Sequence, residues 1–100
     1  MKRILHIVNK SRLEHNALNS CLRILGAGDA LLLIENGVYN ALNTAENRQV
    51  LSETGIPVYV LAPDLQARGY TEQDVLGHIA GIDYGEFVEL TVDYELSQSW

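Results

Sequence analysis

The sequence contains few of the residues on which several classes of protein depend. It has a single cysteine, and 7 Lys and Arg residues face 13 Asp and Glu residues, which leaves a formal net charge of -6. One cysteine cannot form an internal disulfide, and its isolation favours a reducing, cytoplasmic setting. Direct binding to nucleic acid is not expected, because contacts to phosphates need clustered Lys and Arg.

Long hydrophobic runs are also missing. Residues 1–8 begin with two basic side chains and continue with apolar ones, but His6 interrupts this stretch and Asn9 and Lys10 end it. A secretory segment needs roughly 7 to 15 apolar residues. A membrane-spanning helix needs about 18. We therefore expect neither a targeting segment nor contact with a membrane.

Motifs for metals and nucleotides are absent as well. The three histidines, His6, His15 and His78, lie far apart and have no partner at the spacing of a zinc site. Residues 26–29 contain two glycines, but they follow an expected helix and precede an expected strand, the reverse of a dinucleotide-binding turn. No phosphate-binding loop is present. We expect no metal and no cofactor.

The most informative stretch is an apolar run at residues 30–34. Gly26 and Gly28 precede it, and residues 35–37 close it with the sequence Glu-Asn-Gly. Consecutive apolar positions are typical of a strand that is covered on both faces, as in a parallel sheet flanked by helices. A core helix is the alternative, but the run is too short for one. We therefore predict a central strand, with possible chemistry just beyond its carboxyl end.

The rest of the chain alternates between strand and helix patterns. Further strands are expected at residues 3–8, 58–61, 79–82 and 96–100, the last at an edge of the sheet. Helical segments are expected at residues 11–26, 38–42, 44–53, 65–68, 71–76 and 83–92. Three of them begin with the spacing of a helix cap, in the pairs Ser11 and Glu14, Thr71 and Asp74, and Asp83 and Glu86. With 47% hydrophobic residues, the 100 residues suffice for one core. The order predicts one α/β domain over residues 1–100, with three layers and a mainly parallel sheet of about five strands.

Polar residues follow several of these strands, and in a parallel sheet they meet at one edge. The residues expected at this edge are Asn9, Lys10, Ser11, Glu35, Asn36, Asp64, Asp83 and Tyr84. Glu35 can contact a ligand, form the turn or pair with Lys10. Arg68 can form a salt bridge in its loop or bind a ligand. A small-ligand binding domain that uses this edge is one functional hypothesis, and it rests on the fold alone. The large side chain of Trp100 suggests a subunit interface.

Cys21 is the one side chain able to carry out covalent sulfur chemistry. It lies near the middle of the expected helix at residues 11–26, where the helix dipole gives little support to a thiolate. The pattern alone favours a core cysteine over a reactive one. The apolar half of that helix comprises Leu13, Ala17, Leu18, Cys21, Leu22, Ile24 and Leu25.

Five segments together resemble the DsrH/TusB family of sulfur-relay proteins. They are residues 5–11, residues 31–42, residues 59–69 and the ending from Ile82-Asp83-Tyr84 to Ser99-Trp100, which is counted as its start and its close, and the resemblance extends over essentially the whole chain. It implies a small α/β subunit of the DsrE/DsrF/DsrH type. It also implies assembly with DsrE-like and DsrF-like (TusD/TusC-like) paralogues into a heterohexamer with two copies of each chain.

The resemblance has a specific implication for Cys21. In this family the cysteine that accepts sulfur as a persulfide belongs mainly to the DsrE or TusD subunit. Cys21 matches a helix position that carries a cysteine in the DsrH branch, whereas TusB proteins lack it. The resemblance thus implies that Cys21 carries a persulfide in a DsrEFH-type complex for dissimilatory sulfur oxidation, which supplies a downstream acceptor protein. The alternative is a TusB-like structural subunit in a relay for tRNA 2-thiouridine synthesis, with the catalytic cysteine on a paralogue.

Overall fold

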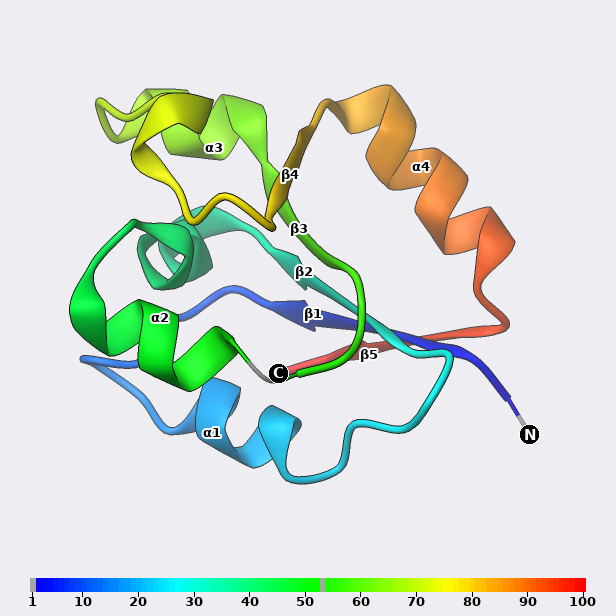
Figure 1. The fold of residues 1–100 in the computed structure, drawn as a ribbon. Helices are drawn as coiled ribbons and strands as arrows, with labels where there is room; N and C mark the ends of the chain where they lie inside the picture. The colour runs from blue at the N-terminus through cyan, green and yellow to red at the C-terminus, as the bar shows by residue number, and fades with distance from the viewer. Residues whose placement is uncertain (1, 53) are drawn as a thin grey trace.

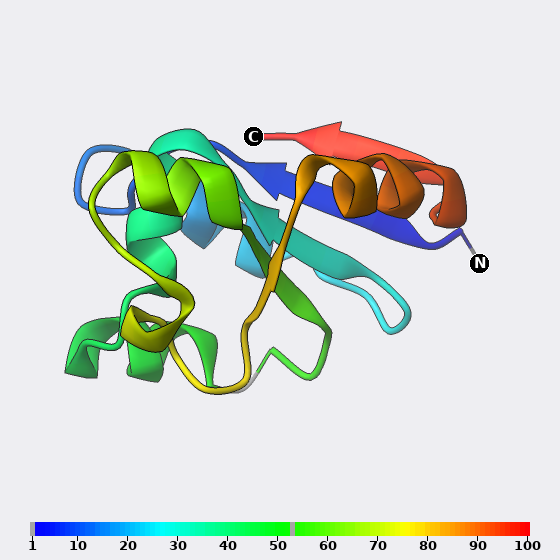
Figure 2. The same cartoon turned by 90° about the horizontal axis from the view of Figure 1, so that it is seen from above.

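The computed structural model describes residues 2–52 and 54–100 and contains one parallel sheet of five strands (Figure 1). The strands are β1 (Ile4–Val8), β2 (Ala30–Leu33), β3 (Val58–Leu61), β4 (Ala80–Ile82) and β5 (Leu96–Ser99). Their order in the sheet is β4-β3-β2-β1-β5. The apolar run forms β2, the middle strand, and all four of its residues are buried. β5 lies at one edge beside β1 (Figure 2). The α/β fold with a parallel sheet is confirmed.

The helical segments alternate with the strands. They are α1 (Ala17–Leu22), the 3-10 helix η1 (Glu35–Ala41), α2 (Ala45–Leu51), α3 (Ala62–Ala67), the 3-10 helix η2 (Glu72–Asp74) and α4 (Tyr84–Asp93). In Figure 1, α1 and α2 lie on one side of the sheet and α4 lies on the other. The molecule therefore has three layers. No helix in the described part of the chain is long and apolar enough to cross a membrane.

Two clusters of apolar side chains fill the spaces between the layers. Val8 belongs to a cluster that includes Leu18 of α1 and Leu51 of α2. Leu5 belongs to a second cluster, against which Phe87 of α4 packs. Because successive side chains of a strand point to opposite faces, these two clusters mark the two sides of the sheet.

The first helix is much shorter than predicted, and its predicted start at Ser11 is wrong. The buried side chain of Asn40 in η1 accepts a hydrogen bond from the backbone N–H of Arg12 (2.9 Å) and donates one to the carbonyl of Lys10 (3.0 Å). The hydroxyl of Ser11 accepts from the N–H of Leu13 (3.2 Å). The backbone of this loop is thus hydrogen-bonded by side chains, which competes with helix formation. The chain enters α1 only at Ala17.

Three members of the predicted apolar half, Leu13, Ile24 and Leu25, consequently lie outside α1, and Leu25 packs, partly buried, against the cluster that contains Val8. Leu13 is in the preceding loop and is 81% exposed, and Ile24 follows the helix and is 58% exposed.

Three of the other helix starts, those of α2, η2 and α4, have local side-chain caps. The hydroxyl of Thr44 accepts from the backbone N–H of Asn47 (3.1 Å) at the start of α2. The predicted caps at Thr71 and Asp83 are both present as reciprocal capping boxes. The helix predicted at residues 44–53 corresponds to α2, and its predicted end at residue 53 lies outside the described residues. The segment predicted at residues 65–68 begins earlier, at Ala62, and the one predicted at 71–76 is reduced to the single turn η2.

Candidate functional site

The loop after β2 is held tightly against the end of β1. Glu35 adopts a positive φ of 49°, a conformation that is uncommon outside glycine. Two residues later, a Cβ on Gly37 would collide with the carbonyl oxygen of Val8. The backbone N–H of Ile34 also donates to that carbonyl (3.0 Å). Glu35 therefore forms the turn, which is one of the roles expected for it.

Hydrogen bonds connect this turn to α3. The N–H of Glu35 donates to Asp64 Oδ2 (2.7 Å), and the Arg68 guanidinium donates to Asn36 Oδ1 through Nε (3.1 Å) and Nη2 (2.9 Å). Arg68 also donates to the backbone carbonyl of Asp64 (3.0 Å), and it forms no salt bridge with the carboxylate of that residue. The suggested pairing of Glu35 with Lys10 is likewise not formed. These contacts fix the loop and leave Asn36 exposed and Arg68 partly exposed at its surface.

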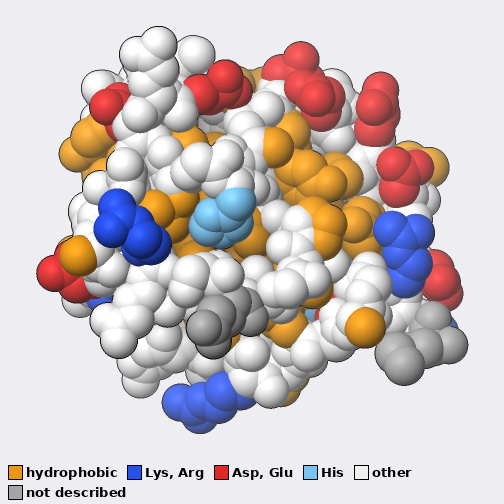
Figure 3. All heavy atoms as spheres, in the orientation of Figure 1, with side chains coloured by type: hydrophobic (Ala, Val, Ile, Leu, Met, Phe, Trp, Pro, Cys, Tyr) orange, Lys and Arg blue, Asp and Glu red, His pale blue; other side chains and the backbone are white. Residues whose placement is uncertain are grey.

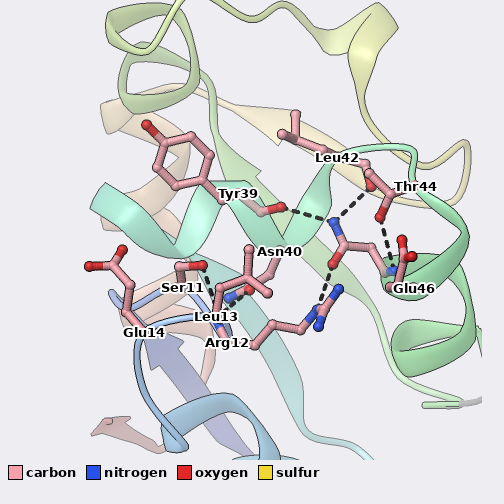
Figure 4. Close-up of a pocket in the computed structure, with 10 residues that line it drawn as sticks. Ser11, Arg12, Leu13, Glu14, Tyr39, Asn40, Leu42, Thr44 and Glu46 are labelled. Atoms are coloured by element: carbon pink, nitrogen blue, oxygen red, sulfur yellow. Dashed lines mark hydrogen bonds between the residues drawn. The ribbon is translucent and has the colours of Figure 1, made fainter.

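A cavity of about 640 Å³ lies between the β1–α1 loop, η1 and α2 (Figure 4). The Arg12 side chain reaches across it and donates from Nε to Asn47 Oδ1 (2.9 Å). Asn47 in turn donates to the carbonyls of Tyr39 (2.9 Å) and Leu42 (3.0 Å). Among the described residues, no buried side-chain nitrogen or oxygen lacks a hydrogen-bond partner. The buried polar groups of this cavity are thus committed to the fold.

A smaller hollow of about 200 Å³ lies at the predicted edge of the sheet. Its lining consists of Asn9, Lys10, Ser11, Glu14, His15 and Asn36. Four of the eight predicted edge residues therefore converge there. Glu35 and Asp64 face each other beside it through the contact described above. Asp83 and Tyr84 line neither hollow, because they follow β4, which β3 and β2 separate from β1. Asp83 instead caps α4 by accepting from the N–H of Glu86 (2.8 Å).

Cys21 is fully buried in the cluster between the sheet and α1. Burial, with a smaller contribution from the negative charge of Asp29, raises the pKa of its thiol from 9.0 to about 12. Reactive cysteines lie in partly exposed, electropositive surroundings, and this site has the opposite character. This is the environment of a core cysteine, the alternative that the helical pattern favoured.

Asp29, His6 and Trp100 form a chain of hydrogen-bonded side chains that the sequence did not indicate. The chain runs from the residue before β2, over β1, to the residue after β5, and lies near Cys21. His6 Nε2 and Asp29 Oδ2 are 2.9 Å apart, and Trp100 Nε1 lies 3.2 Å from His6 Nδ1. An indole N–H can only donate, so His6 Nδ1 accepts. The neutral imidazole then carries its proton on Nε2 and donates to Asp29. Trp100, expected at a subunit interface, is partly buried against its own chain.

Asp29 is the acceptor at the end of this chain. Burial by itself raises the pKa of its carboxyl group, but hydrogen bonds from the Gly26 N–H, His6 and the Ile4 N–H outweigh it and lower that pKa below its ordinary value. The carboxylate is therefore ionised at neutral pH. Asp29 also closes the turn at residues 26–29, between α1 and β2, by accepting from the Gly26 N–H and donating its own N–H to the Gly26 carbonyl.

The buried pair of His6 and Asp29 is closed off from both hollows. The pair therefore orders the fold. No group of three or more potential ligands capable of holding a metal ion occurs among the described residues.

Comparisons with known proteins agree on one family. The model of the "DsrH like protein" family matches residues 10–97. A protein named TusB from Pectobacterium parmentieri is 40% identical over 97 residues, which cover 97% of this chain and 100% of the relative. A protein named TusB from Shigella flexneri is 43% identical over 79 residues, which cover 79% of this chain and 82% of the relative.

Solved structures give the same picture. The solution structure of protein Tm0979 from Thermotoga maritima is 32% identical and has a TM-score of 0.69, with coverage of 90% of this chain and 92% of that one. The ychN protein from E. coli has a TM-score of 0.77 over the full length of both chains, but at 14% identity it shows only the shared fold.

Proposed function

The chain belongs to the DsrH-like protein family, and from this premise we propose that it is a non-catalytic subunit of a sulfur relay for tRNA 2-thiouridine synthesis. In this proposal a paralogue carries the reactive cysteine, and the present chain completes the complex. The names of its relatives, which include TusB at about 40% identity over most of the chain, support this pathway. Sulfur oxidation has no comparable support.

The observation that carries the proposal is the environment of Cys21. Persulfide transfer requires a thiolate that can reach the sulfur donor. With a pKa of about 12, on the order of one thiol in 10⁵ is ionised at pH 7. The side chain is also fully buried. Both properties suit a packing residue.

The carrier role of Cys21 in a DsrEFH-type complex for sulfur oxidation stays a prediction. Its support is the resemblance of this helix position to that of the DsrH branch. It requires the thiol to become exposed when the complex assembles, which would need α1 to move away from the sheet. The complementation experiment described below, with Cys21→Ala, distinguishes the carrier role from the packing role.

The proposal includes the partners and the setting. We expect TusD-like and TusC-like paralogues (the DsrE-like and DsrF-like chains) in a heterohexamer, a downstream sulfur acceptor protein and a cytoplasmic location. Neither nucleic acid nor a membrane is expected to bind this chain directly.

The test uses cells from which the gene for this chain has been deleted. We expect the 2-thiouridine content of tRNA to fall in these cells and to return with the wild-type gene. Cys21→Ala should restore it equally, provided that immunoblotting shows normal protein levels, because the thiol carries no sulfur. Unchanged 2-thiouridine in the deletion strain would reject the pathway. Failure of a well-folded Cys21→Ala variant would reject the non-catalytic role.

A further inference from the structure

Helix α4 has an apolar stripe that this chain leaves uncovered. Tyr84, Val88 and Val92 follow one another at one-turn spacing and are 58%, 62% and 78% exposed. The side of the helix toward the sheet is formed by other residues, Phe87 and Leu90. Single exposed hydrophobic residues are ordinary on a protein surface. Three on consecutive turns form a continuous strip, which is typical of an interaction site.

The same region carries the excess negative charge of the chain. From residue 72 onward the sequence has no Lys or Arg, and its acidic residues are Glu72, Asp74, Asp83, Glu86, Glu89, Asp93 and Glu95. Residues 1–71 contain all 7 basic residues and are close to neutral. Figure 3 shows acidic side chains gathered over α4. With 3.6 residues per turn, Glu86, Glu89 and Asp93 form a stripe next to the apolar one.

These charges determine which partner fits. A second copy docking through the same face would bring acidic stripes together, and such juxtaposition is costly at an interface. We propose that α4 binds a partner chain of the relay through a surface on that chain in which an apolar strip is bordered by Lys and Arg. The apolar contact supplies affinity, and the opposite charges accelerate and orient the encounter. This inference rests on the proposed function.

The experiment measures binding of this chain to its co-expressed TusC-like and TusD-like paralogues. The test variant is Val88→Ser with Val92→Ser. The matched control is Leu13→Ser with Ile24→Ser, which also removes two exposed apolar side chains but lies next to α1, on the other side of the sheet. We expect the α4 variant to bind at least about tenfold more weakly and the control to bind within about twofold of wild type. Circular dichroism confirms that each variant is folded.

A second variant tests the charges. Glu89→Lys with Asp93→Lys leaves the apolar stripe intact and should slow association and reduce its dependence on salt. Equal affinities for the wild type and the Val88→Ser, Val92→Ser variant would overturn the assignment of α4 and leave the proposed function standing. A wild-type homodimer that the same variant dissociates would also overturn it. If the wild-type chain binds neither paralogue, the proposed function fails together with this inference.

Discussion

The indole N–H of Trp100 donates a hydrogen bond to Nδ1 of His6 across 3.2 Å, and this joins the residue after β5 to a fully buried side chain of β1. The backbone N–H of Trp100 also donates to the carbonyl of Ile7 (2.9 Å). Lys10 Nζ donates to the carbonyl of Trp100 (3.1 Å). β5 is an edge strand in which every residue is exposed, so these three bonds hold it at the end of its pairing with β1.

Trp100→Phe tests this attachment. Phenylalanine retains a large ring but has no N–H, so Nδ1 of buried His6 loses its donor. An unsatisfied buried polar group costs about 1–3 kcal/mol. We expect the free energy of unfolding in urea to fall by about that amount. The control is Gln98→Ala, an exposed position on the same strand, which should change stability by no more than ~0.5 kcal/mol. A Trp100→Phe variant as stable as wild type would show that the indole contact contributes nothing.

The lowered pKa of Asp29 predicts how the free energy of unfolding depends on pH. Its hydrogen bonds lower the pKa of its carboxyl group in the folded state, so the unfolded state binds a proton more readily. The resulting stability is fully present above the ordinary pKa of an aspartate, about 3.9, and is lost as pH falls through the lower folded value.

The substitution Asp29→Asn removes the pH-dependent contribution of this carboxylate to stability. An amide cannot accept from the Ile4 and Gly26 N–H groups and from His6 as a carboxylate does, so we expect a loss of about 1.5–3 kcal/mol at pH 7. The difference in unfolding free energy between wild type and variant should shrink between pH 5 and acid pH. An equal difference at all pH values would contradict the assignment.

Gly37→Ala tests the close approach of the two loops. A Cβ at this position collides with the backbone of Val8, which cannot swing away as a side chain can. Overpacking of this kind costs about 1–3 kcal/mol. Gly77→Ala is the control, because no atom lies within 4 Å of the Cβ it would add. Thermal unfolding should separate the two variants, and equal melting temperatures would mean that the loops are not held together as described.

Alkylation measures the state of the thiol. Because burial raises the pKa of Cys21 to about 12, we expect iodoacetamide to modify the folded chain far more slowly than the chain in urea. The rate in the folded state should keep rising with pH from 7 to 10. A rate that levels off about one unit above the ordinary thiol pKa of about 8.5 would reveal an exposed, ordinary thiol.

The strands and the starts of α2, η2 and α4 could be predicted because their signals are local. The apolar run of β2 and the capping pair of Asp83 and Glu86 lie within a few neighbouring residues. The start of α1 could not be predicted in this way. Ser11 and Glu14 have the spacing of a cap, but Asn40, distant in sequence, hydrogen-bonds the backbone on both sides of Ser11.

The candidate site was predictable only in part for the same reason. In a parallel sheet the residues that follow the strands meet at one edge, and this correctly predicted that Asn9, Lys10, Ser11 and Asn36 lie together. The buried chain of His6, Asp29 and Trp100 joins residues 23 and 94 positions apart. No local pattern encodes such contacts, because they depend on the strand order, which places β1 between β2 and β5. A histidine within an otherwise apolar strand was the one available signal.

The most direct test of the account is mass spectrometry of the assembled complex after incubation with a persulfide donor. One added sulfur increases the mass of a cysteine peptide by ~32 Da. We predict that this increase appears on the reactive cysteine of the paralogue while the peptide that carries Cys21 stays unmodified. Sulfur on Cys21, formed as fast as transfer through the complex and followed by loss of transfer in Cys21→Ser, would contradict the account and identify this chain as a sulfur carrier.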